Sequence, residues 1–286
     1  MNLTITDELL NKFNDDGYLI ISNFFTDEEI DNLQKAYVRL YALQVAKMLD
    51  YRKNIPKSIV DCTTMDDLIK IIEPLEENDK EALYQVQKLI SYSPEVKRFM
   101  INQKMIDWSS KLLDCPKELI LMDSLGLLIN RPDTTRLLYK WHSEVHYYPK
   151  RENFLNLYFP TFLEKTNENG HMLLAKGSHK ISYIPFIEYQ GYNTDNVGKK
   201  NHFVQYEVPE SFVKKFEKIP VNTKVGDVVF FHRNLIHTST PNKSGKYSFA
   251  SVGRIWEPRK DLTLSGNFVA KPYGNDYGRP NIDIIQ

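Results

Sequence analysis

The most constraining feature of the sequence is a change of hydrophobic period near Glu118, from helix-like spacing before it to strand-like alternation after it. At least seven segments beyond Glu118 alternate in this way, with Gly, Pro and Asn turns and no helix-length segment between them. This succession predicts an antiparallel sandwich or jelly roll, mainly β with flanking α-helices. The segments are ELILMDSLGLLINRP, TTRLLYKWHSEVHYYP, ENFLNLYFPTFL, HMLLAK, VQYEVP, KVGDVVFFHRNLIHTS and KYSFASVGRIWEP.

The first third of the chain is predicted to be mainly helical. Thr26 and Glu29 form a capping box at which a long helix begins. Residues 79–90 and 93–100 repeat the helical spacing, the second with Ser93 as its cap. These helices are expected to pack on the β-structure.

The length of the chain suits one large domain, with no second core required. We expect a single domain over residues 1–286. Its helical part covers about 1–117, its barrel about 118–260, and a tail follows over 261–286.

Composition limits the class of partner. The chain has 37 basic and 37 acidic residues, so no overall field attracts nucleic acid or an anionic membrane, and a small-molecule substrate is expected. Cys62 and Cys115 form no CxxC pair, which is typical of a reducing compartment and predicts a cytoplasmic protein. No signal sequence or membrane span is expected. The oligomeric state, monomer or dimer, stays open.

Two separated segments carry the residues that bear on function. In WHSEVHYYP (141–149), His142 and Glu144 stand at alternate positions, so along a strand both point to one face. In KVGDVVFFHRNLIHTSTPN (224–242), a buried strand ends at His237. Two histidines and one carboxylate form the facial triad that holds Fe(II) and leaves positions open for a cosubstrate and O2. Taken alone, the first segment could also be a solvated polar face. The second segment, which adds His237, favours a metal site.

The chain resembles the phytanoyl-CoA dioxygenase family of Fe(II)- and 2-oxoglutarate-dependent oxygenases. The segments GYLIISNFFTDEEIDNLQ, WHSEVHYYP, NGHMLLAKGSHK and GDVVFFHRNLIHTSTPN carry the resemblance in the family's order, within residues 17–254. It implies a double-stranded β-helix, which is a distorted jelly roll, with His142, Glu144 and His237 as iron ligands and with 2-oxoglutarate and O2 as cosubstrates. The family usually has Asp at the position of Glu144. Its halogenating members lack the carboxylate, so Glu144 implies oxygen transfer.

The main departure from the family concerns the cation that binds 2-oxoglutarate. In the family an arginine about eleven residues after the second histidine pairs with the far carboxylate of this cosubstrate, and here that position is Ser248. A carboxylate in a dry pocket needs a countercharge. We expect Arg254, farther along the same strand, or Lys140, just before the first histidine, to supply it. Arg136 is a third candidate.

Residues beside the predicted metal site are candidate substrate contacts. If residues 134–148 form one strand, His146 and Tyr148 point to the same side as the proposed ligands. A hydrogen-bonded structural role fits His146 equally well. Ser239 and Asn242, in a turn that resembles the family's H-x-S-x-x-N turn, are expected to fix a loop.

The predicted function is therefore the oxidation of an unactivated C–H bond in a small molecule, with a biosynthetic pathway as its expected context. Hydroxylation is the default outcome, with desaturation or oxidative cyclisation as variants. The irregular stretches 51–67 and 182–203 and the tail 271–286 are rich in polar residues, which favours a polar substrate over a fatty acyl chain. Two alternatives remain: a ligand-binding barrel without catalysis, and a cupin-type metal enzyme that uses His146 as a further ligand and needs no 2-oxoglutarate.

Overall fold

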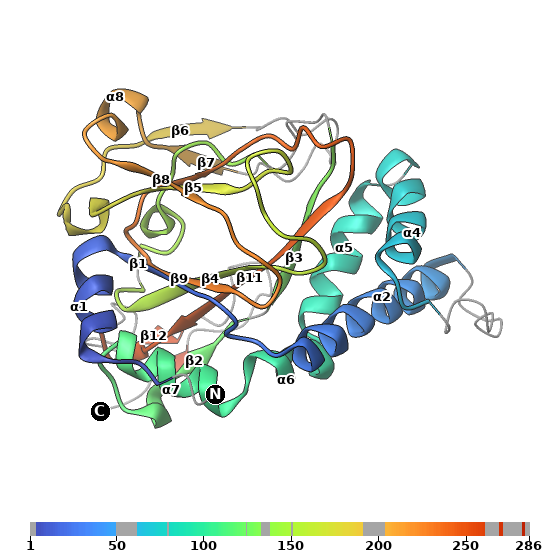
Figure 1. Ribbon diagram of the computed structural model, residues 1–286, viewed down its shortest axis with the longest axis horizontal. Coiled ribbons are helices and arrows are strands. Elements are labelled where there is room, and N and C mark those ends of the chain that lie inside the picture. The colour runs from blue at the N-terminus through green and yellow to red at the C-terminus, as the bar shows by residue number, and fades with distance from the viewer. Residues whose placement is uncertain are drawn as a thin grey trace.

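A layer of helices covers one side of a two-sheet β-structure (Figure 1). The chain is described by a computed structural model over the following residues: 4–49, 62–78, 80–123, 125–132, 138–149, 151–190, 204–260, 269–270 and 282–283. None of the helices in these ranges is both long enough and apolar enough to cross a bilayer.

The helices precede most of the strands. The capping box is confirmed: the Thr26 N–H donates to Glu29 Oε2 at 2.8 Å, and the Glu29 N–H donates to Thr26 Oγ1 at 3.2 Å. Ser93 likewise caps its helix by accepting from the N–H of Glu95 at 3.3 Å. The helices are α1 (Asp7–Asp16), α2 (Asp27–Leu49), α4 (Met65–Asn78), α5 (Lys80–Ser91), α6 (Pro94–Met100), α7 (Gln103–Leu112) and α8 (Glu210–Val213), with short 3-10 turns at Lys117–Leu119, Glu144–His146, Ser178–Lys180 and Pro258–Lys260.

Two antiparallel sheets form the barrel. The larger has the order β1-β9-β4-β11, with β2 and β3 both on the far side of β11, and the smaller has the order β10-β5-β8. The strands of the larger sheet are β1 (Tyr18–Ile21), β2 (Leu121–Met122), β3 (Gly126–Asn130), β4 (Phe154–Pro160), β9 (Val228–His232) and β11 (Ser248–Trp256). Those of the smaller sheet are β5 (Met172–Ala175), β8 (Lys218–Val221) and β10 (His237–Ser239), and the pairs β6 (Ile187–Gln190) with β7 (Val204–Glu207) and β12 (Val269–Ala270) with β13 (Ile282–Asp283) stand apart from both.

Strand alternation divides the large sheet into two buried faces. On β4, Leu157 and Phe159 belong to the core shared with the helices, whereas Tyr158 belongs to a second core shared with the small sheet. On β11, Phe249 faces the helices and Ala250 faces the small sheet. A sheet buried on both faces explains why β4 contains no exposed residue. The expected double-stranded β-helix with flanking helices is confirmed.

Some local expectations were wrong. Residues 134–148 do not form one strand: within the described part, 138–149, only His142 makes a β-bridge, and a 3-10 turn follows over Glu144–His146. The stretch 182–203, expected to be irregular, contains β6, and the end of the stretch 51–67 opens α4. Residues 51–61 and 191–203 lie outside the described ranges, as does nearly all of the tail.

The expected division into a helical part and a barrel stays a prediction. One strand crosses it, because β1 lies in the first third of the chain and pairs with β9 of the large sheet along its whole length. The N-terminal part therefore contributes an edge strand to the barrel as well as helices that pack against it.

Candidate metal centre

Two backbone hydrogen bonds bring the two predicted histidines side by side. The N–H of His142 donates to the carbonyl of His237, and the N–H of His237 donates back, both at 2.9 Å. His237 begins β10, whose other edge pairs with β5 through Leu174. Opposed residues of an antiparallel pair project to the same side. The two imidazole rings accordingly lie with their centroids 4.1 Å apart.

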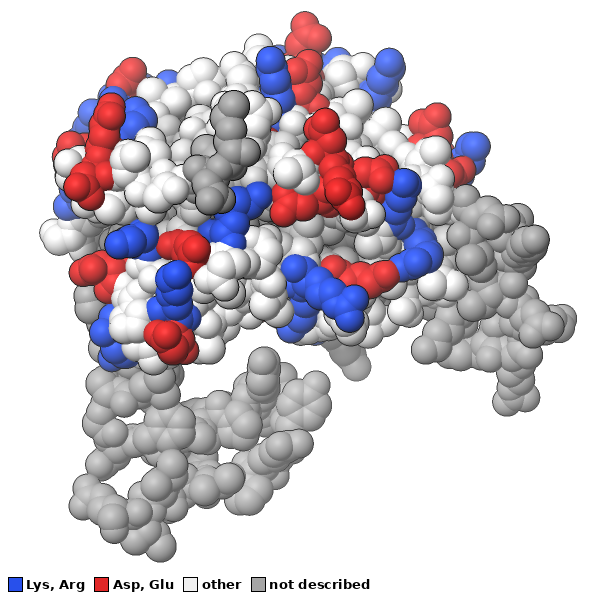
Figure 2. Space-filling view, turned by 60° about the horizontal axis from the view of Figure 1, so that its bottom comes forward, with Lys and Arg blue, Asp and Glu red and all other residues white. Residues whose placement is uncertain are grey.

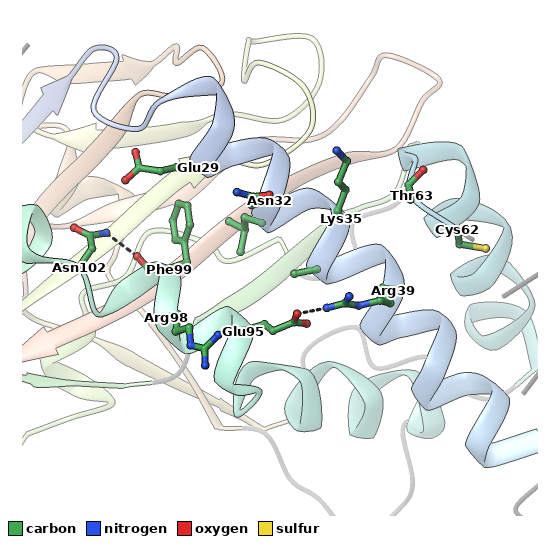
Figure 3. Close-up of a pocket in the computed structure, with 12 residues that line it drawn as sticks. Glu29, Asn32, Lys35, Arg39, Cys62, Thr63, Glu95, Arg98, Phe99 and Asn102 are labelled. Carbon is green, nitrogen blue, oxygen red and sulfur yellow. Dashed lines mark hydrogen bonds and ion pairs between the residues drawn. The ribbon is translucent and has the colours of Figure 1, made fainter. Parts of the chain in front are cut away.

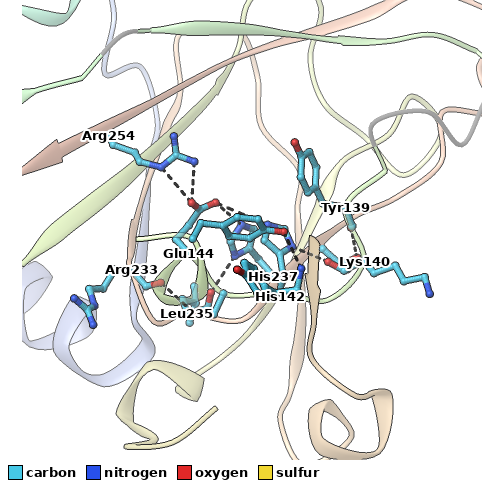
Figure 4. Close-up of polar contacts among 12 residues, drawn as sticks. Tyr139, Lys140, His142, Glu144, Arg233, Leu235, His237 and Arg254 are labelled. Carbon is cyan, nitrogen blue, oxygen red and sulfur yellow. Dashed lines mark hydrogen bonds and ion pairs between the residues drawn. The ribbon is translucent and has the colours of Figure 1, made fainter. Parts of the chain in front are cut away.

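The carboxylate reaches the same point through a turn rather than through strand alternation. The chain leaves the β-bridge after His142 and enters the 3-10 turn that begins at Glu144. Ser143 Oγ anchors this corner by donating to the carbonyl of Arg233 at 3.1 Å. Glu144 Oε1 then lies 3.9 Å from the Nε2 atom of each histidine. Figure 4 shows the three side chains converging.

Hydrogen bonds fix which histidine nitrogen is available for a metal. Nδ1 of His142 lies 2.6 Å from the carbonyl oxygen of Lys140, and Nδ1 of His237 lies 3.0 Å from that of Leu235. A carbonyl only accepts, so each Nδ1 carries the proton and each Nε2 presents a lone pair toward Glu144. Burial lowers the pKa of His142 and holds that of His237 well below its usual value. Both rings are therefore neutral, as metal ligands must be.

The three residues form a compact, buried donor set. One ligand atom of each, two imidazole nitrogens and one carboxylate oxygen, all lie within 4.8 Å of one another. Their exposed fractions are 5%, 7% and 6% for His142, Glu144 and His237. Nitrogen and oxygen donors in this number suit Fe(II) and leave coordination positions for other ligands. The site thus fits the ion that the sequence predicted.

Arg254 holds the second oxygen of the carboxylate. Its Nε and Nη2 donate to Glu144 Oε2 at 3.2 and 2.8 Å, and its guanidinium lies 4.7 Å from the ring centroid of Tyr148. The two oxygens of the carboxylate therefore have different partners: Oε2 is bound to Arg254, and Oε1 is directed at the two histidines (Figure 4). Groups that hydrogen-bond to metal-binding side chains in this way orient those side chains and tune their affinity for a metal.

The other predicted site residues lie in different places. Lys140 Nζ pairs with Glu207 at 2.8 Å, and in Figure 4 its side chain points away from the three ligands. His146 Nε2 contacts the carbonyl oxygen of Ile184 at 3.1 Å, and His146 does not belong to the cluster of possible metal ligands among the described residues. Arg136 lies outside the described ranges.

The sequence did not predict Lys165, which lies beside Ser248, the position where the family has an arginine. Ser248 is buried at the start of β11, and Lys165 Nζ donates to its Oγ at 2.5 Å. Lys165 itself is 0% exposed. It lies in the polar stretch between β4 and β5, where a lysine would ordinarily be read as a solvated surface residue. The only hint was indirect, namely that some cation had to replace the missing arginine.

A hollow of about 630 Å³ opens elsewhere, on the helical side (Figure 3). It lies along α2 and α6, and the ion pair between Arg39 and Glu95 stands within it. None of the three proposed ligands lines it. We therefore do not associate this hollow with the metal centre.

Comparisons with known proteins show the family and the fold. The family model described as phytanoyl-CoA dioxygenase (PhyH) matches residues 13–249. A mouse protein named peroxisomal phytanoyl-CoA dioxygenase is 24% identical over 252 residues, which are 85% of this chain and 66%, just under two thirds, of that protein.

Solved structures show the same architecture. EctD from S. alaskensis, crystallised with 2-oxoglutarate and 5-hydroxyectoine, has a TM-score of 0.59 and 18% identity, covering 91% of this chain and 79% of its own. SnoK, a non-haem α-ketoglutarate-dependent carbocyclase from nogalamycin biosynthesis, has a TM-score of 0.53 and 15% identity, covering 88% and 84%. At these identities the likeness concerns the fold.

Proposed function

Because the chain belongs to the phytanoyl-CoA dioxygenase family, we propose that it is a non-haem Fe(II)- and 2-oxoglutarate-dependent oxygenase that oxidises a C–H bond of a small molecule. One observation carries the proposal. Two neutral imidazoles and one carboxylate oxygen, all buried, face a common point, with each Nδ1 already occupied by a backbone carbonyl.

In this proposal His142, Glu144 and His237 hold the iron through Nε2, Oε1 and Nε2. Bound Fe(II) supplies the redox chemistry by which O2 and 2-oxoglutarate together oxidise the substrate. The carboxylate has one more methylene than the family's usual Asp, and Glu144 reaches the histidines from the start of a 3-10 turn. A retained carboxylate leaves no position for a halide, which supports oxygen transfer.

The remaining side chains keep the site ordered and dry. Arg254 fixes the rotation of the Glu144 carboxylate, so that one oxygen stays directed at the histidines. Phe231 lies against His237 with ring centroids 4.8 Å apart, and it belongs to the apolar core between the two sheets. The protein's contribution to such chemistry is to bind, orient and exclude water.

We extend the proposal to a small, polar substrate. Nδ1 of His146 is buried without a hydrogen-bond partner among the described residues, and the rings of Phe186 and Tyr206 lie 4.5 and 5.9 Å from the His146 ring. This aromatic group with an unused nitrogen suits a polar ligand. Tyr148, which lies over Arg254, is a second candidate contact. Hydroxylation, as the ligand named with EctD suggests, is the default outcome, and ring closure, as SnoK's name suggests, is the variant.

Cellular context belongs to the same proposal. A cytoplasmic, biosynthetic enzyme is our expectation, although the mouse relative is named peroxisomal, and fractionation of cells that express the tagged chain tests it. On the face shown in Figure 2, basic and acidic side chains are interspersed. Such a surface suits a partner that is neither nucleic acid nor an anionic membrane.

Succinate release tests the proposed function. The purified chain with Fe(II), O2 and 2-oxoglutarate should release succinate, and His142→Ala and His237→Ala should abolish both release and iron binding. His179→Ala, which changes a histidine outside the donor set, should leave iron binding intact. No release with any candidate substrate, despite bound iron, would indicate a binding barrel, whereas substrate oxidation without 2-oxoglutarate would indicate a cupin-type enzyme.

A further inference from the structure

Lys165 is a cation buried without a countercharge. Its side chain is 0% exposed, and among the described residues the polar partners of its amine are neutral: Ser248 Oγ at 2.5 Å and Asn130 Oδ1 at 3.3 Å. Among the described residues no carboxylate forms an ion pair with it. Lysine is almost never fully buried unless it is paired. Burial alone lowers the pKa of the Lys165 amine to about 7.

The strand β11 connects Lys165 to the metal centre along one face. Ala250 and Val252 face the core between the two sheets, so Ser248 and Arg254, which follow the same alternation, face it too. Arg254 meets Glu144 at one end of this face, and Ser248 meets Lys165 at the other. The amine thus contacts the side chain at position 248, from which the family's arginine would extend.

Ser248 Oγ contacts the amine, and Thr223, the backbone partner of Lys165, carries a second hydroxyl group. Lys165 and Thr223 exchange backbone hydrogen bonds of 2.8 and 3.1 Å, so their side chains project to the same side of that pair. Thr223 is 3% exposed, and its Oγ1 has no hydrogen-bond partner among the described residues. Ser248 Oγ accepts from Lys165 and retains its own proton for donation.

These groups have the chemistry of a carboxylate site. An ammonium group has three N–H donors, and two of those of Lys165 are used by Ser248 and Asn130. The third N–H and the two hydroxyls are left to donate. Charge-assisted hydrogen bonds to a carboxylate would satisfy all of them and neutralise the buried charge.

A second unpartnered donor marks the metal end of the same interior. Asn156 is 3% exposed, and its Nδ2 has no partner among the described residues. It follows the alternation of Tyr158 and pairs in register with Phe231, the residue whose ring contacts His237. Donors without partners therefore lie near Lys165 and near the proposed metal ligands, at the two ends of the core between the sheets. A ligand with a polar group at each end could use both.

We propose that Lys165, with the hydroxyls of Ser248 and Thr223, binds the far carboxylate of 2-oxoglutarate in place of the arginine that position 248 lacks. The inference rests on the proposed function. The two leading cations predicted from the sequence already have acidic partners, because Lys140 pairs with Glu207 and Arg254 pairs with Glu144.

Binding of two 2-oxo acids to the Fe(II)-loaded full chain without oxygen tests this inference. 2-Oxoglutarate and 2-oxobutyrate share the end that chelates iron, and only the former has a far carboxylate. Chelation by either produces a charge-transfer absorption that can be titrated. Lys165→Met should weaken binding of 2-oxoglutarate about tenfold or more, or about 1.4 kcal/mol, and leave 2-oxobutyrate within about twofold. Thr223→Val should give a smaller loss of the same selectivity.

Controls separate the possible outcomes. Lys180→Met, which removes an exposed lysine paired with Asp15, should change neither titration. Equal weakening of both acids by Lys165→Met, or no weakening, would overturn the inference, and so would a selective loss in Lys140→Met instead. If the iron-loaded wild type gives no absorption with either acid, the proposed function itself fails, and the inference with it.

Discussion

Removing the buried amine should stabilise the protein when no ligand is bound. The pKa of Lys165 is about 7 in the folded chain, against an ordinary value of 10.5. At neutral pH and below, folding therefore forces a charged amine into a dry site or makes it release its proton. From the difference between the two pKa values, at about 1.4 kcal/mol per pH unit, the cost approaches about 5 kcal/mol as an upper bound. Lys165→Met replaces the amine by an apolar group of similar length and should recover part of that cost.

The dependence on pH gives this prediction its sign. Between the two pKa values the unfolded chain holds a proton on Lys165 that the folded chain has released. Unfolding then takes up a proton, so the free energy of unfolding rises with pH by about 1.4 kcal/mol per unit from about pH 7 to about pH 10. The full cost applies below this window. Lys165→Met should lack the rise, and its advantage over the wild type should shrink as the pH increases.

Urea denaturation of the metal-free chain at several pH values within this window measures the effect. Comparing wild type with Lys165→Met cancels the titration of all other groups, and Lys180→Met serves as a control that should follow the wild type. Parallel curves for wild type and Lys165→Met would refute the reasoning, since they would mean that the amine is not held in a dry environment. A less stable Lys165→Met would mean that the lysine serves the fold rather than a ligand.

Two further predictions concern the metal centre, and a third concerns the loop that holds Asn242. Glu144→Ala should end 2-oxoglutarate-dependent oxidation while Glu144→Asp, the family's usual residue, retains part of it; full activity of the alanine variant would place the carboxylate ligand elsewhere. Arg254→Met should weaken iron binding about tenfold or more by freeing the Glu144 carboxylate, as judged by equilibrium dialysis, and unchanged affinity would contradict its orienting role. Asn242→Ala should lower the free energy of unfolding by about 2 kcal/mol in urea denaturation, because its amide spans Asn130, Ser244 and Lys246; a loss within error would contradict the expectation that it fixes the loop.

The sequence revealed the fold because alternation is a local signal. The two buried faces of β4 and β11 follow directly from the period of two, and capping by Thr26 and Ser93 depends on neighbours within three residues. Helices α1, α4 and α7 were not predicted. Their apolar residues enter the same core as those of α2, α5 and α6, and their spacing is equally local, so these three helices were overlooked rather than hidden from the sequence.

The three proposed metal ligands lie together, but the argument that grouped them was partly wrong. His142 and Glu144 were expected to share the face of one strand, whereas a β-bridge places the first and a 3-10 turn places the second. Strand alternation also predicted that His146 lies beside the proposed ligands. The 3-10 turn instead directs its ring to the carbonyl oxygen of Ile184. The sequence could not show Lys165 at all. Its burial depends on pairing with Thr223 and on contact with Ser248, both distant in sequence.

A crystal structure of the full chain, grown without oxygen in the presence of Fe(II) and 2-oxoglutarate, tests the central claim most directly. The account predicts one iron, located by its anomalous scattering, bound by Nε2 of His142, Nε2 of His237 and one oxygen of Glu144, with the 2-oxo acid end of the cosubstrate on the metal. Iron bound elsewhere, or cosubstrate density away from these three residues, would contradict it.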